Sequence, residues 1–178
     1  MPRNSKSYLR SLPYEEVDTL PIAGLGGIVA LAYLIGLTRN PEIRTQVTIE
    51  IARPPEKVFP LLADPNEIPK YWPGVEKIEI LQRNPLRYRM IAKEGNGTME
   101  VTTSDPPRHI VTKSIEHSMG VSGVWDTTIS PTPTGSHLEH KTVMQIHNPM
   151  LRTLAMFMDA NAEELKTLEA IKRYAESR

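Results

Sequence analysis

The sequence predicts an α+β domain, in which a seven-stranded antiparallel sheet is covered on one face by a long C-terminal helix. Between residues 149 and 178, apolar side chains recur every three or four positions, which is the period of an amphipathic helix. Short stretches of alternating apolar and polar residues precede this helix, and turn-forming residues separate them. The helix must bury its apolar face on another element, and the sheet offers that surface.

The expected order is one strand, two short helices, six strands and the long helix. The first strand is predicted at 46–52, where apolar and polar residues alternate. The short helices are predicted at 55–62 and 67–72, and Pro60 should shorten or kink the first of them. The six further strands are expected at 75–82, 86–93, 98–104, 109–117, 121–130 and 137–146.

The N-terminal part of the chain differs from this domain at 45–178. Residues 1–19 are polar and mixed in charge, which predicts a flexible segment. Residues 20–37 contain no charge and would form about 27 Å of helix, close to the ~30 Å hydrocarbon layer of a bilayer. We therefore expect a separate N-terminal hydrophobic helix, namely a transmembrane helix of a single-pass membrane protein, followed by a linker at 38–44. A cleaved signal peptide and a buried helix of a soluble domain are the alternatives.

Spacing within the hydrophobic segment suggests one further contact. Ala23 and Gly27, like Ala32 and Gly36, are four residues apart, and small residues at this spacing let two helices approach closely. A homodimer through this helix is therefore possible.

Composition excludes several classes of function. Lys and Arg number 21, as do Asp and Glu, so no basic excess indicates a nucleic-acid partner. The absence of Cys excludes disulfides, thiolate zinc sites and cysteine nucleophiles. No phosphate-binding loop, nucleophile elbow or metal-binding motif occurs, so we expect neither a cofactor nor a metal.

The stretch 49–81, IEIARPPEKVFPLLADPNEIPKYWPGVEKIEIL, contains a recognisable opening. Its strand ending in Ala-x-Pro, its Leu-Leu-Ala-Asp-Pro turn and its Trp-Pro-Gly-Val entry to the next strand resemble the START-like, Bet v 1-like (SRPBCC) superfamily. Relatives of the polyketide cyclase/dehydrase and coenzyme Q-binding types belong to it. The resemblance implies a helix-grip fold, with a cavity between the sheet and the C-terminal helix. It also implies binding of a lipid, quinone or polyketide-like molecule, whereas a minority of the superfamily are enzymes.

The inward face of the strands and the apolar stripe of the helix should line this cavity. Apolar walls with a few polar groups are typical of ligand sites, and methionine side chains adapt to irregular ligands. The candidate lining residues are Tyr88, Met90, Trp125, Thr127, His140, Thr142, Met144, Phe157, Met158 and Asn161. Asn161 interrupts the apolar stripe, so it must either bond a neighbouring backbone or point into a wet pocket. A filled core with satisfied polar groups is the alternative.

His140 is the ionisable candidate within this set. A neutral imidazole beside Trp125 and Met144 can act as a general base, and Tyr88 is the candidate acid. We predict a membrane-anchored domain that binds a hydrophobic small molecule. A cyclase/dehydrase-type enzyme using His140 is the first alternative, and a structural or partner-binding module with a filled core is the second.

Overall fold

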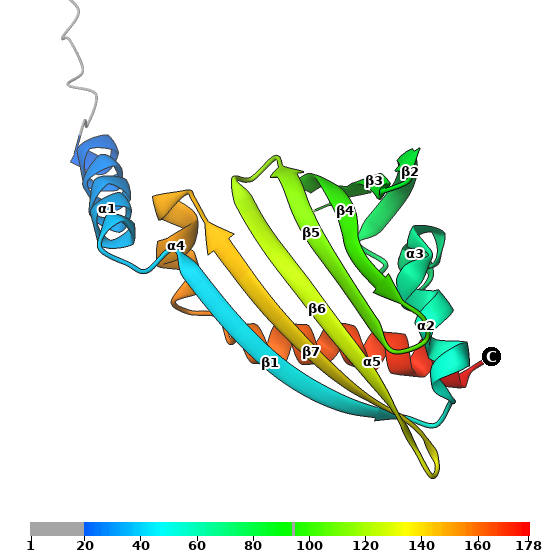
Figure 1. Cartoon of the computed structure of the whole chain (residues 1–178). Helices are drawn as coiled ribbons and strands as arrows, with labels where there is room; N and C mark the ends of the chain where they lie inside the picture. The colour runs from blue at the N-terminus through cyan, green and yellow to red at the C-terminus, as the bar shows by residue number, and fades with distance from the viewer. Residues whose placement is uncertain (1–19, 94) are drawn as a thin grey trace, which may run out of the picture.

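The computed structural model describes residues 20–93 and 95–178. The segment at 1–19, which the sequence predicts to be flexible, lies outside the described residues. Seven antiparallel strands form one sheet, as predicted. Their order in the sheet is β1–β7–β6–β5–β4–β3–β2 (Figure 1). Their bounds are β1 Glu42–Ile51, β2 Val75–Arg83, β3 Leu86–Ala92, β4 Gly95–Asp105, β5 His109–His117, β6 Val121–Thr132 and β7 Gly135–Ile146.

Two short helices connect β1 and β2, as the sequence predicts. They are α2 (Pro55–Ala63), which contains Pro60, and α3 (Ile68–Tyr71), with a 3₁₀ turn η1 (Pro65–Glu67) between them. The start of the domain differs from the prediction. Because Glu42 pairs with Gln145 of β7, β1 already begins within the segment expected to be a linker.

The single C-terminal helix expected at 149–178 is two helices, α4 (Pro149–Ala155) and α5 (Ala160–Glu176). The predicted helix is interrupted at Asp159, because the carboxylate of this residue accepts a hydrogen bond from the Ala162 N–H at 3.1 Å and so caps a new helix. An aspartate that caps a new helix in this way competes with continuation of the preceding one. The apolar side chains of the connection 156–158 therefore do not follow the stripe of α5.

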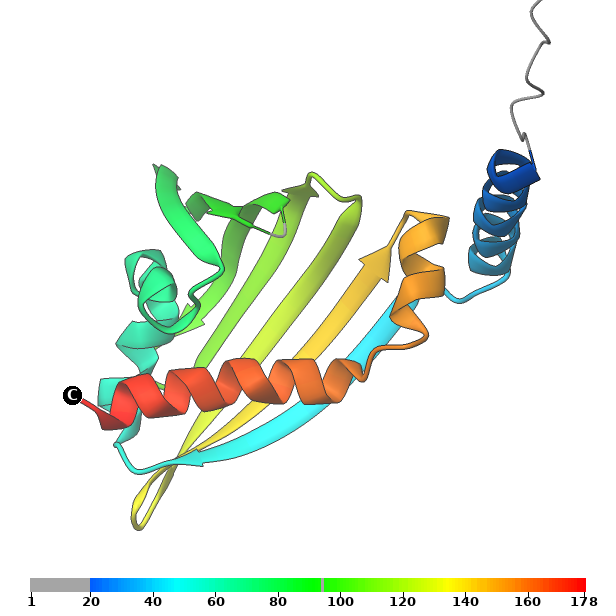
Figure 2. The same ribbon diagram turned by 180° about the vertical axis from the view of Figure 1, so that it is seen from behind.

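The apolar core lies under only one half of α5. This helix crosses the concave face of the sheet (Figure 2), and its buried side chains, Leu168, Ile171 and Ala175, lie between its midpoint and its C-terminal end. They pack with residues of α2 and of the sheet: Ile51, Val58, Phe59, Leu61, Ile110, Ile129 and Leu138. The N-terminal half of α5 consequently lies over a different part of the sheet.

Helix α1 (Leu20–Leu37) packs against α4. The Thr153 hydroxyl donates to the Ala32 carbonyl at 2.6 Å, and a Cβ on Gly36 would lie 1.8 Å from the Pro149 carbonyl oxygen. The small residues Ala32 and Gly36, which the sequence suggests for a homodimer contact, thus meet α4 of their own chain.

Among residues 20–93 and 95–178, no helix is long and apolar enough to cross a membrane. The transmembrane helix expected at 20–37 is not supported by this finding.

Candidate functional site

Strand register gathers polar side chains under the N-terminal half of α5. On the concave face, Thr127 of β6 pairs with His140 of β7, and Trp125 pairs with Thr142. Strand β1 places Thr45 beside Thr142 on the other side of β7. Alternation along each strand explains this placement, because His140 and Thr142 lie two and four residues after the fully buried Leu138. The face of β7 that carries Leu138, His140 and Thr142 is therefore the one turned toward α5.

The carboxylate of Glu164 reaches these strands from α5. Its Oε2 lies 3.5 Å from the Nε2 of His140, and the two side chains are 14% and 12% exposed. On the other side of the ring, the Thr127 hydroxyl lies 2.7 Å from Nδ1. We call Glu164, His140, Thr127, Thr142 and Thr45 the concave polar cluster.

Contacts of His140 assign roles to its two ring nitrogens. An ionised carboxylate only accepts hydrogen bonds, so Nε2 bears the proton that faces Glu164. In the neutral ring Nδ1 is then the basic nitrogen and accepts the Thr127 hydroxyl. Glu164 and Thr127 together hold a histidine in one orientation with its basic atom on the strand side.

Opposing effects act on the pKa of Glu164. Burial alone would raise the pKa of this carboxyl, but hydrogen bonding to His140 and the charge of His140 act against it. The proximity of Thr142 and Trp125 lowers the pKa by smaller amounts, although the Thr142 hydroxyl makes no hydrogen bond to the carboxylate. The balance lowers the pKa below its ordinary value, so Glu164 is ionised at neutral pH.

This lowered pKa predicts an acid-sensitive contribution to stability. A group whose pKa is depressed by folding stabilises the protein above its unfolded pKa, about 4.3 for glutamate, and that contribution disappears as pH falls toward the folded pKa. Glu164→Gln should therefore flatten the fall in the free energy of unfolding below that pH, as measured by urea titration. Glu163→Gln, which replaces the exposed neighbour that pairs with Lys166, is the control. The expectation would be contradicted if the free energy of unfolding fell with pH in parallel for Glu164→Gln and the parent protein.

Two hydroxyls of the concave polar cluster lack partners. Thr45 is 8% exposed and Thr142 is 2% exposed, and within the described residues neither Oγ1 atom makes a hydrogen bond. A buried hydroxyl without a partner costs about 1–3 kcal/mol. These two atoms can therefore bond an oxygen- or nitrogen-bearing group that enters between α5 and the sheet.

Tyr88 lies outside this cluster. Together with Met90 and Trp125 it belongs to a second apolar cluster around Ile68, and burial raises the pKa of its hydroxyl. Strands β4, β5 and β6 separate β3 from β7, so Tyr88 and His140 are four strand spacings apart, roughly 19 Å along the sheet. Glu164, not Tyr88, is the ionisable group facing His140.

Three predicted lining residues of the terminal helix lie elsewhere. Phe157 and Met158 belong to the α4–α5 connection and are 82% and 58% exposed, so neither is part of the concave polar cluster. Asn161 accepts a hydrogen bond from the Gln46 backbone N–H at 3.3 Å, which is the first of the two alternatives given above. Met144 remains on the inward side of β7, where it pairs with Gly123.

Glu164 is not among the lining residues predicted from the sequence, because a glutamate in an amphipathic helix suggests a solvent-facing position. A signal was nevertheless present. Glu164 precedes Leu168 by four residues and Ile171 by seven, so it belongs to the stripe whose other members are buried. A carboxylate inside such a stripe must find a partner, and the nearest strands provide His140.

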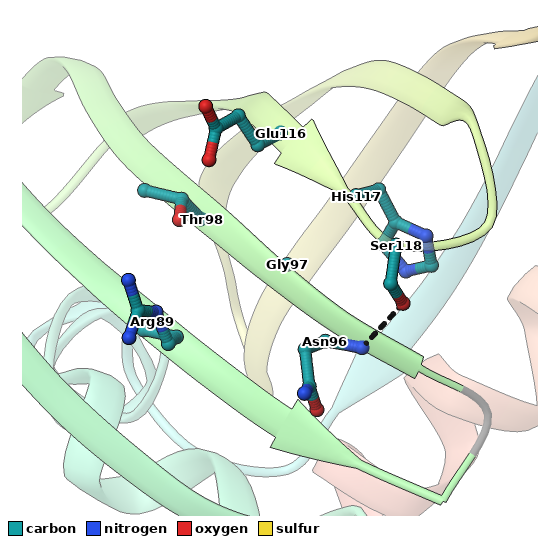
Figure 3. Close-up of a pocket in the computed structure, with 7 residues that line it drawn as sticks. All are labelled: Arg89, Asn96, Gly97, Thr98, Glu116, His117 and Ser118. Carbon is teal, nitrogen blue, oxygen red and sulfur yellow. Dashed lines mark hydrogen bonds between the residues drawn. The ribbon is translucent and has the colours of Figure 1, made fainter.

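Two hollows of the structure lie away from the concave polar cluster. Figure 3 shows one of about 490 Å³ on β3, β4 and β5, where Arg89, Thr98 and Glu116 lie side by side. Its lining also includes Asn96, Gly97, His117 and Ser118. The other, of about 430 Å³, lies between the start of α2 and the end of α5. Among the described residues, no group of three or more acidic or histidine side chains is placed to hold a metal ion.

Solved structures share this architecture. The Zhui aromatase/cyclase from Streptomyces sp. R1128 is similar with a TM-score of 0.64 and 18% identity, over 77% of this chain and 95% of that chain. A norcoclaurine synthase from Thalictrum flavum has a TM-score of 0.59 and 14% identity, over 76% and 95% of the two chains. A protein from Mesorhizobium loti has a TM-score of 0.58 and 20% identity, over 76% and 98%. At these identities the likeness shows the fold, which is the Bet v 1-like fold expected from residues 49–81.

The sequence itself carries the family assignment. No curated protein matches the chain significantly. The profile of the family described as polyketide cyclase/dehydrase and lipid transport matches residues 42–176, which run from the first residue of β1 to the last residue of α5. The chain belongs to the polyketide cyclase/dehydrase and lipid transport family.

Proposed function

We propose that the protein binds a hydrophobic small molecule between α5 and the concave face of the sheet, with an oxygen-bearing group of that molecule at the concave polar cluster. The observation that carries this proposal is the contrast between the two halves of α5. Its C-terminal half packs on a filled apolar core. Its N-terminal half carries Glu164 and lies over His140 and two buried hydroxyls that have no partner in the described structure.

The family supports the apolar part of the ligand, and the polar cluster supports the oxygen-bearing part. Hydrophobic ligands and cyclisation substrates of the polyketide type both fit the family description. Carbonyl and hydroxyl oxygens are among the groups that the two unpartnered threonine hydroxyls can bond. A lipid, a quinone or a polyketide-like ligand provides such an oxygen.

An enzyme of the cyclase type is the second candidate, because the ring of His140 is oriented for proton transfer. Glu164 faces Nε2 and leaves Nδ1 as the basic atom, next to the Thr127 hydroxyl. Once the Thr127 hydroxyl turns away from Nδ1, this atom can take a proton from a carbon beside a carbonyl, the step that starts an aldol-type cyclisation. The proton then resides on Nδ1, and Glu164 stabilises the imidazolium that forms.

Thr142→Val tests the binding site directly. Valine keeps the shape of threonine and removes the unpartnered hydroxyl, so the unliganded protein should become more stable by about 1 kcal/mol. The same change should reduce the amount of small molecule that native mass spectrometry detects on protein purified from its own cells.

Thr127→Val is the matched control on the neighbouring strand. Its hydroxyl is bonded to His140, so its removal should destabilise the protein. If no molecule accompanies the parent protein, and extracts of lipids, quinones and polyketides give no complex, the structural module with a filled core is the better description.

A further inference from the structure

Exposed apolar side chains gather at the end of the molecule formed by α1, α4 and the α4–α5 connection. On α1 it comprises Leu25, Ile28, Val29, Leu31, Leu34 and Leu37, and on α4 and the α4–α5 connection Leu154, Met156, Phe157 and Met158. These ten side chains are between 47% and 82% exposed. Figure 2 shows α1 and α4 side by side, and the contact of Thr153 with Ala32 joins them. We call these ten residues the apolar end.

The geometry of α1 distinguishes between possible occupants of the apolar end. Successive residues of a helix are about 100° apart, so Leu31, Leu34 and Leu37 with Tyr33 cover roughly half of its circumference on the side away from α4. Nearer its start, Leu25, Ile28 and Val29 are exposed as well, although they point in different directions. A helix that is apolar all round is normally buried on every side. A second copy or another protein would cover one face, whereas lipid covers all of them.

Charge on the two segments agrees with a lipid surface. Between residues 20 and 41 the only charged side chain is Arg39, and between 147 and 158 the only Asp, Glu, Lys or Arg is Arg152. At the border, Glu42 is paired with Arg44 at 2.7 Å, and Asp159 is occupied as the cap of α5. The guanidinium of Arg152 is bonded to the backbone carbonyls of Ile146, Gly36 and His147, whereas Arg39 is exposed. The apolar end therefore presents no free carboxylate and one exposed arginine, a combination that suits a bilayer containing anionic headgroups.

We propose that the apolar end is a docking surface for a lipid bilayer, with α1 and the side chains of Phe157 and Met158 entering its apolar layer. The proposal goes beyond the ligand site and stands on different residues. It also gives that site a route of supply, because Glu164 lies five residues after Asp159, about 7.5 Å along the helix axis. A hydrophobic molecule leaving the bilayer at the α4–α5 connection would have a short path to the concave polar cluster.

Vesicle flotation of the full chain tests this proposal. The protein is made by cell-free translation in the presence of vesicles of phosphatidylcholine and phosphatidylglycerol, which are then floated on a sucrose gradient. The parent should float with the vesicles. Phe157→Asp should lower the vesicle-bound to free ratio by roughly tenfold or more, because burial of a phenylalanine ring is lost and a negative charge is added.

Leu81→Asp is the matched control, since Leu81 is 49% exposed on β2, at the opposite edge of the sheet from β1. It should float as the parent does. Circular dichroism checks that both variants are folded. The proposal is overturned if the parent stays at the bottom of the gradient, or if Phe157→Asp and Leu81→Asp float equally. Light scattering that shows a discrete dimer without vesicle binding would identify a second copy as the occupant instead. None of these outcomes depends on the small-molecule ligand, so the ligand proposal is tested separately.

Discussion

Leu138→Ala is expected to lower the free energy of unfolding by about 2–5 kcal/mol, as large-to-small changes in a filled core do. Leu138 is fully buried in the first half of β7, where Ile49 of β1 and Ile129 of β6 pair with it. Because these neighbours belong to paired strands, they cannot move inward to fill the space, and the cost should lie well inside that range. The loss of stability is measured by urea denaturation, with tryptophan fluorescence as the signal of unfolding.

The control for this change is Leu81→Ala. Leu81 is exposed on β2, so truncation of its side chain should change the free energy of unfolding by no more than about 0.5 kcal/mol. A loss below about 1 kcal/mol for Leu138→Ala would show that the core beneath the C-terminal half of α5 is loosely packed, contrary to the division of α5 into a filled half and a ligand-binding half.

His140→Gln separates the two proposed functions. If the protein is a binder, glutamine keeps a polar group of similar size, so affinity should fall by a few-fold to about tenfold. If it is an enzyme, glutamine cannot carry the proton, so turnover should fall by roughly 10²–10⁴ while binding survives. We expect the binder result. The measurement uses the molecule recovered from native extracts, with its products followed by mass spectrometry.

His137→Gln is the control on the same strand. His137 lies on the opposite face of β7, where its ring contacts Glu50 at 2.6 Å, and it should affect neither binding nor turnover. Conversion of the recovered molecule by the parent, abolished in His140→Gln and retained in His137→Gln, would establish the enzyme and refute our expectation.

The two proposals for the molecule meet at the N-terminal end of α5. Asp159 begins this helix beside the apolar end, and Glu164 faces the sheet about one and a half turns later. If the chain formed one uninterrupted helix from residue 149, Phe157, Met158 and Glu164 would all belong to that helix. The interruption instead lets the connection point outward while Glu164 faces inward.

The sequence by itself determined where the strands lie and which side chains of a strand share one face of the sheet. Side chains alternate along a strand with a period of two, so once Leu138 is recognised as buried, His140, Thr142 and Met144 must share its side of the sheet. Turn residues such as those around Gly95 and Gly120 delimit the strands locally, and residues 49–81 identify the superfamily. All of these are properties of neighbouring residues, which a local pattern records.

Tertiary structure decided which of these side chains meet. Glu164 faces His140, and Asn161 bonds Gln46, only because α5 crosses the sheet over β1 and β7. The start of that helix depends on whether Asp159 caps a new helix or stays within an old one, a choice between states of similar local energy. Packing of Leu168 and Ile171 on the strands resolves this choice, since burial of an apolar stripe outweighs the preference of any single residue.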